Sequence, residues 1–175
     1  MSVKDFPVPL TLELDVQSDI AEQNTSGKYP NEFITSPEWQ QWFTQWLEEM
    51  HPELSPIQSY ALSLRLTLDK EMKHFNGTFR HIDKATDVLA FASLEREALP
   101  PEIWESQPME LGDIIISVET ADRQAREQGH SIKKEVAWLA SHGLLHLLGW
   151  DHPDDESLEQ MLAQQSKLLA LVGLH

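Results

Sequence analysis

Three histidines lie close together in the stretch HGLLHLLGWDH, which begins at residue 142. His142 and His146 are four residues apart, so in a helix both rings project from the same face, about one turn apart. Gly149 lets the chain leave the helix and turn back, which can bring His152 to the other two rings. Three neutral imidazoles that leave a fourth position open for water are typical of a catalytic zinc site. The spacing therefore predicts that His142, His146 and His152 bind one metal ion per chain, with Zn²⁺ favoured, although Ni²⁺, Co²⁺ or Cu²⁺ could bind the same ligands.

The residue after the first histidine argues against a peptidase. The histidine spacing equals that of the H-E-x-x-H-x-x-G-x-x-H metalloproteases, in which the glutamate is the general base. This chain has Gly143 at that position. A zincin-like metallopeptidase is therefore the minor alternative. A second alternative is a non-catalytic protein whose zinc is structural and has a fourth protein ligand.

Hydrophobic patterns indicate the elements that must position these histidines. Period-two alternation predicts strands, and helical spacing with capping residues predicts helices. The predicted strands are 8–16, 60–68, 86–92 and 111–118. One predicted helix starts at Ser36, and a second covers 69–76 and is ended by Gly77. The other predicted helices are 119–128, 131–148 and 155–172. Residues 18–35 and 99–108 are predicted loops. We expect one α+β domain over residues 1–175, with a mixed sheet of about four strands, four to five helices and a zincin-like metal-binding helix.

Two of the predicted helices have clear apolar faces. Trp39, Trp42 and Trp46 share one face of the helix that starts at Ser36, which favours packing in the core over a cofactor or base-stacking role. In the last helix the residues expected to point inward are Leu158, Met161, Leu162, Leu168, Leu169 and Val172.

Composition narrows the possible functions. The 175 residues include no cysteine, which excludes disulfides, thiolate metal ligands and cysteine nucleophiles. The net charge of −16 argues against a general basic surface for nucleic acid, but residues 61–86 hold five basic and three acidic side chains and are the net-positive stretch. No apolar run approaches a membrane span, and MSVKDFPVPL does not resemble a signal peptide, so we expect a soluble intracellular protein.

The histidine stretch and two upstream segments resemble one family. HGLLHLLGWDH resembles the signature H-G-x-L-H-L-x-G-x-D-H of the YbeY family. Residues 76–91 match N-G-x-x-R-x-x-D-x-x-T-D-V-L-x-F, and the segment that starts at Leu111 matches L-G-D-I-x-I-S. The chain departs from the family at Ala85 and Ala92, where proline is usual or frequent, and both departures affect loop rigidity more than chemistry.

This resemblance implies a function and a set of site residues. YbeY proteins are bacterial, metal-dependent endoribonucleases that are specific for single-stranded RNA. They act in maturation of the 16S rRNA 3′ end and in ribosome quality control. The resemblance implies a cytoplasmic enzyme whose partners are rRNA, the small ribosomal subunit and assembly GTPase factors, with no DNA and no membrane. His142, His146 and His152 would be the zinc ligands, and Arg80 would hold the phosphate in a positive channel. Arg80 and His142 are thus the candidate catalytic residues, while Asp151 could be a general base, cap a turn or orient a histidine.

Overall fold

A four-stranded mixed sheet organises the structure, a computed structural model that describes residues 8–23, 27–29 and 33–175. The strands are β1 (Thr11–Ser18), β2 (Ser59–Thr67), β3 (Val88–Ala92) and β4 (Met109–Ser117). Their order across the sheet is β1-β2-β4-β3, with β1, β2 and β4 parallel and β3 antiparallel to β4. The mixed α+β architecture predicted from the sequence is confirmed, but several strand boundaries differ from the prediction. Strand β1 covers 11–18 and not 8–16, β3 begins at 88 and not at 86, and β4 begins at 109 and not at 111.

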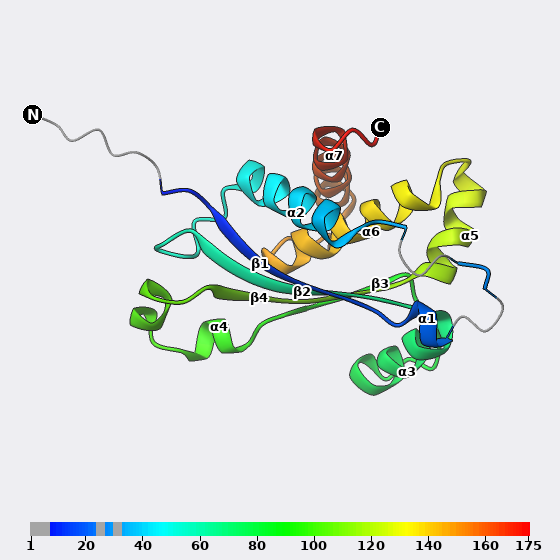
Figure 1. Cartoon of the computed structure of the whole chain (residues 1–175), viewed down its shortest axis with the longest axis horizontal. Coiled ribbons are helices and arrows are strands. Elements are labelled where there is room, and N and C mark those ends of the chain that lie inside the picture. The colour runs from blue at the N-terminus through cyan, green and yellow to red at the C-terminus, as the bar shows by residue number, and fades with distance from the viewer. Residues whose placement is uncertain (1–7, 24–26, 30–32) are drawn as a thin grey trace, which may run out of the picture.

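Five longer helices and two short ones accompany the sheet in the described part of the chain (Figure 1). The longer helices are α2 (Ser36–Met50), α3 (Asp69–Arg80), α5 (Val118–Gln128), α6 (Ile132–Leu147) and α7 (Asp155–Leu171). The short ones are α1 (Ile20–Gln23) and α4 (Glu95–Ala98), and a 3-10 helix, η1, covers Pro101–Glu105. Both predicted loops therefore contain helical turns, while residues 24–26 and 30–32 of the first loop lie outside the described residues.

Helices cover the two faces of the sheet unequally. Figure 1 shows α2, α6 and α7 on one side of the sheet and α3 and α4 on the other. The side under α2 and α6 holds the main hydrophobic core, where Trp39, Trp42 and Trp46 are buried as predicted. In α7 the inward stripe is narrower than expected, because Leu158 and Leu162 are 36% and 39% exposed.

Helix α3 is longer than the sequence predicted. It continues through Gly77 to Arg80 and ends at His81, which adopts the left-handed conformation with φ 59°. The extra turn places Phe79 against Phe91 of β3, with ring centroids 5.3 Å apart. Tertiary contact of this turn therefore outweighs the weak helix propensity of glycine.

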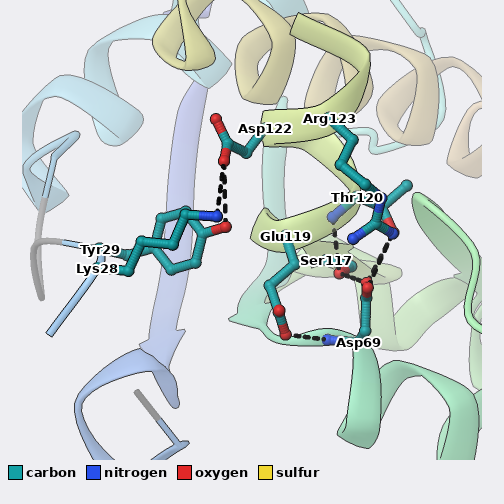
Figure 2. Close-up of polar contacts among 8 residues, drawn as sticks. All are labelled: Lys28, Tyr29, Asp69, Ser117, Glu119, Thr120, Asp122 and Arg123. Atoms are coloured by element: carbon teal, nitrogen blue, oxygen red, sulfur yellow. Dashed lines mark hydrogen bonds and ion pairs between the residues drawn. The ribbon is translucent and has the colours of Figure 1, made fainter. Parts of the chain in front are cut away.

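Polar contacts fix the start of α3 to the start of α5 (Figure 2). The Glu119 carboxylate accepts a hydrogen bond from the backbone N–H of Asp69, at 3.0 Å. In return the Asp69 carboxylate accepts hydrogen bonds from Ser117 and Thr120 and pairs with Arg123 at 2.8 Å. We call these five residues the α3–α5 clamp.

A separate contact in Figure 2 attaches residues 27–29 to α5. Tyr29 donates its hydroxyl to Asp122 at 3.2 Å, and the Lys28 ammonium lies 3.5 Å from the same oxygen. None of the helices in the described part of the chain is long and apolar enough to cross a membrane.

Candidate metal centre

The three predicted histidines meet at the C-terminal end of α6. One ring nitrogen from each of His142, His146 and His152 lies within 4.8 Å of the other two. The Nε2 atoms of His142 and His146 are 3.0 Å apart, and the ring centroids are separated by 4.6 to 5.6 Å. Three nitrogens bound to one tetrahedral Zn²⁺ at 2.0–2.1 Å would lie about 3.3 Å apart, so this group fits a small divalent cation after minor side-chain adjustment.

The end of α6 explains how the third histidine reaches the first two. The N–H of Trp150 donates to the carbonyl of Leu145 at 2.9 Å, and the N–H of Gly149 donates to that of His146 at 3.0 Å. Gly149 has φ 96°, a conformation that side chains disfavour, so the chain reverses there. The predicted turn is confirmed, and it carries His152 back beside the helix.

A buried glutamine fixes the orientation of the first histidine. Gln165 of α7 is fully buried, and its Nε2 donates to the carbonyl of Trp138 at 3.3 Å. Because that carbonyl can only accept, the other amide atom, Oε1, faces Nδ1 of His142 at 3.0 Å. This contact favours the tautomer with the proton on Nδ1, in which the lone pair on Nε2 of His142 faces Nε2 of His146 and can bind a metal.

The surroundings of the second histidine lower its pKa and so favour the neutral form. Burial lowers the pKa of His146, and the neighbouring His142 and His152 lower it further, while a hydrogen bond with the backbone of Trp150 opposes both effects. A neutral imidazole is the form that binds metal, so the environment of His146 favours ligation near neutral pH.

The absence of a glutamate at position 143 follows from packing. A Cβ atom on Gly143 would lie 2.8 Å from Cγ2 of Ile114 and 3.1 Å from its Cγ1, closer than side chains normally approach. Gly143 thus allows α6 to lie directly on β4. A metalloprotease glutamate at this position would require the Ile114 side chain or the helix that carries the histidines to shift.

Each of the three segments that resemble the family contains an aspartate with a structural partner. The Asp151 carboxylate accepts the backbone N–H of His152 at 2.8 Å, which is the turn-capping role considered from the sequence. Asp113 accepts a hydrogen bond from Ser63, and Asp87 accepts from the backbone of Val88 and from Gln124.

Arg80 lies apart from the histidine group in this structure. It is the exposed last residue of α3, and its guanidinium is 5.9 Å from the centre of the Phe91 ring. Phe91 belongs to β3, on which α6 packs. Arg80 contacts strand β3 through Phe91, and α6, which carries His142 and His146, also packs on β3. Arg80 and these histidines make no direct hydrogen bond.

The sequence analysis did not identify Gln165. Its position between Met161 and Leu168 places an amide on the apolar face of α7, and a polar residue on a buried stripe is the signal that could have revealed it. Its partner is 23 positions earlier in the chain, so the role emerges only from the packing of α7 on α6.

Comparisons with known proteins identify related sequences. A sequence model of the family described as Endoribonuclease YbeY matches residues 24–173. A protein named Endoribonuclease YbeY from Acaryochloris marina is 56% identical over 141 residues, which cover 81% of this chain and 80% of that protein. A second protein of the same name, from Synechocystis sp., is 50% identical over 165 residues, and the match covers 94% of this chain and 92% of that protein.

A solved structure shares the fold. The solution structure of TM1509 from Thermotoga maritima superposes with a TM-score of 0.54 at 22% sequence identity, and covers 91% of this chain and 89% of that one. The histidine group at the end of α6 and the match over nearly the whole chain lead to one conclusion: this chain belongs to the YbeY family.

Proposed function

We propose that this protein is a metal-dependent endoribonuclease that cleaves phosphodiester bonds in RNA at the His142–His146–His152 group. The observation that carries the proposal is the convergence of three imidazole nitrogens within 4.8 Å in a chain whose curated relatives are named endoribonucleases. Zn²⁺ is the proposed ion, one per chain, because three neutral imidazoles suit it and the chain has no cysteine to compete.

The proposed reaction gives different roles to the metal ligands, to Gln165 and to Arg80. When bound, the metal supplies Lewis-acid chemistry to the phosphodiester. Gln165 keeps His142 in the tautomer that offers Nε2 to the site. Arg80 has no ion-pair partner among the described residues, so its guanidinium is available to bind a phosphate through two parallel hydrogen bonds and to stabilise negative charge that develops in the transition state.

The finer assignment rests on the sequence resemblance. The YbeY signature supports unpaired RNA as substrate, maturation of the 16S rRNA 3′ end as process, and the small ribosomal subunit with its assembly factors as partners in the cytoplasm. The net charge of −16 is consistent with an enzyme that reaches its RNA through such a partner.

The first experiment measures bound metal and RNA cleavage together. We expect the purified protein to contain about one zinc per chain and to lose cleavage of single-stranded RNA when the metal is chelated. His142→Ala should lose both metal and cleavage, whereas the control His175→Ala should lose neither. Full cleavage by metal-free protein would contradict the proposal.

A second experiment tests the role of Arg80. Arg80→Glu should lower kcat/KM for RNA by about 10²-fold with the metal content unchanged, because charge stabilisation is lost while the ligands remain. Arg80→Lys should retain part of the activity. Equal cleavage by all three proteins would remove Arg80 from the site.

The same assays separate the alternatives. A metallopeptidase would cut an unstructured protein and leave RNA intact, and the contact between position 143 and Ile114 argues against it. If the protein were a non-catalytic ribosome-assembly factor with a structural zinc, the zinc would have a fourth protein ligand, whereas the group that the described residues bring together contains three histidines. A metal-free protein that unfolds would favour this last alternative.

A further inference from the structure

The uncovered part of the sheet and helix α3 enclose a groove of about 550 Å³ on the side of the sheet opposite α6. Phe75 and Phe79 of α3 and Phe91 of β3 line one wall. Asp15 of β1 and Asp113 of β4 contribute carboxylates to the lining.

The aromatic wall has the geometry of a stack with one free face. The rings of Phe75 and Phe79, one helical turn apart, are nearly parallel at 19° with centroids 6.2 Å apart. Phe79 also contacts Phe91, at 5.3 Å and 57°. Phe79 nevertheless stays 58% exposed, which is unusual for a phenylalanine with two aromatic neighbours. A flat ring placed on Phe79 would continue the stack and bury apolar surface.

The charges around the groove select a neutral ring system. The Arg65 guanidinium lies 5.0 Å from the centre of the Phe75 ring, but Asp19 and Glu71 already neutralise it. Because Asp15 and Asp113 are acidic, the groove disfavours a phosphate in its interior. The same carboxylates can accept hydrogen bonds from the N–H groups of a nucleobase. A base therefore fits the interior, with its phosphates outside.

A cation for those phosphates lies next to two residues that line the groove, Phe79 and Phe91. Arg80 directly follows Phe79, and its guanidinium lies 5.9 Å from the Phe91 ring. Phe91 is on the edge strand β3, whose other face packs under α6, the helix that carries His142 and His146. An RNA strand that crosses this edge could contact Arg80 and reach both sides of the sheet.

We propose that the Phe75–Phe79–Phe91 groove binds one unpaired base of the RNA substrate by stacking on Phe79, with an adjoining phosphate at Arg80. The inference rests on the proposed function, because it assumes an RNA substrate. It adds a place on the sheet, the groove beside β3, where the unpaired strand of the proposed substrate would be recognised apart from the metal site. Double-stranded RNA cannot offer a free base to this groove.

The test measures binding separately from cleavage. The probe is a short, fluorescently labelled 2′-O-methyl oligonucleotide, verified to stay intact during the measurement, and affinity is read by anisotropy with the zinc-loaded protein. Phe79→Ala should weaken binding about tenfold, in line with the loss of one stacked base. Phe79→Trp should bind at least as tightly as the parent, whereas Phe79→Leu, which keeps apolar volume without an aromatic face, should bind as weakly as alanine.

Controls decide whether the effect belongs to the base. Leu171→Ala removes a 45% exposed leucine from α7 and should leave binding unchanged. An oligomer of equal length without bases should bind the parent and Phe79→Ala equally. With cleavable RNA, Phe79→Ala should raise KM about tenfold with kcat and zinc content unchanged.

Two results would overturn the groove proposal: an affinity within twofold of the parent for Phe79→Ala, or full affinity for Phe79→Leu. The second would mean that the oligonucleotide needs apolar surface at position 79 and does not stack a base on an aromatic ring. If Phe79→Ala loses binding but the parent protein cleaves no RNA, the proposed function is contradicted, and the groove remains a base-binding site.

Discussion

At the scale of single residues, the proposed metal site contains an amide contact as well as three imidazoles. Gln165 is fully buried and connects Nδ1 of His142 to the backbone of Trp138. Partners of this kind orient a ligand ring, and their removal typically lowers metal affinity without removing a ligand.

We therefore predict that Gln165→Leu binds zinc 10- to 100-fold more weakly while the protein stays folded. The measurement is competition with a chromophoric chelator, accompanied by circular dichroism. Gln160→Leu, an exposed change on the same helix, is the control and should bind zinc as the parent does. Unchanged zinc affinity in Gln165→Leu would show that the ring of His142 is held by its other contacts.

The residue scale also shows what a sequence can reveal about this site. The triad was predictable because its members share one helix and the turn that follows, so local geometry fixes their distances. Gln165 and the groove phenylalanines were not predictable in this way. Gln165 reaches His142 across 23 positions, and Phe79 meets Phe91 only because β3 takes the edge position next to β4.

At the scale of elements, helix α3 carries both Phe79 and Arg80, and the α3–α5 clamp fixes its first turn. Leu68, the residue before α3, offers no side-chain cap, and Glu119 from α5 takes the free N–H of Asp69 instead. Burial raises the pKa of Asp69, but hydrogen bonds from Ser117, Thr120 and Arg123 together lower it more, so the net shift is downward.

We predict that Asp69→Asn lowers the free energy of unfolding by about 2 kcal/mol at pH 7, since hydrogen bonds to a charged acceptor are lost. The folded-state pKa is below the unfolded one, so the carboxylate stabilises the fold fully above about pH 4 and loses this contribution as the pH falls through its folded pKa. Urea unfolding of parent and variant should therefore converge at low pH.

The control for this prediction is Asp83→Asn, which removes the same charge from a side chain that is 93% exposed and paired with Lys73 at 3.5 Å. It should change stability by less than about 0.5 kcal/mol at either pH. If the difference in free energy of unfolding between the parent and Asp69→Asn stays constant from pH 7 to pH 3, the charge of Asp69 does not contribute to the stability of the clamp.

At the scale of the whole molecule, architecture was easier to predict than the arrangement of its surfaces. Hydrophobic periodicity predicted about four strands and four to five helices, because each pattern lies within the residues of a single element. The order β1-β2-β4-β3 and the uncovered sheet face depend on how distant elements pair, which no local pattern specifies. The groove therefore became visible only in the folded chain.

The charge distribution of the folded molecule leads to a last prediction. The net charge is −16, yet α3 and the loop after it carry the exposed cations Lys70, Lys73, Arg80 and Lys84. If RNA crosses the sheet beside α3, about four phosphates can be neutralised there. For a single strand this corresponds to a slope of about −3 in a plot of log affinity against log salt concentration.

Anisotropy titrations of the uncut oligonucleotide at several salt concentrations measure this slope. Changing both lysines, Lys70→Ala with Lys73→Ala, should make it shallower by about 1.4, because two phosphate contacts are lost. Lys167→Ala, which removes a cation paired with Glu49 at the far side of the molecule, should leave the slope unchanged. A slope steeper than about −6 in the parent would require more phosphate contacts than α3 can supply. The RNA would then follow a different path over this acidic surface.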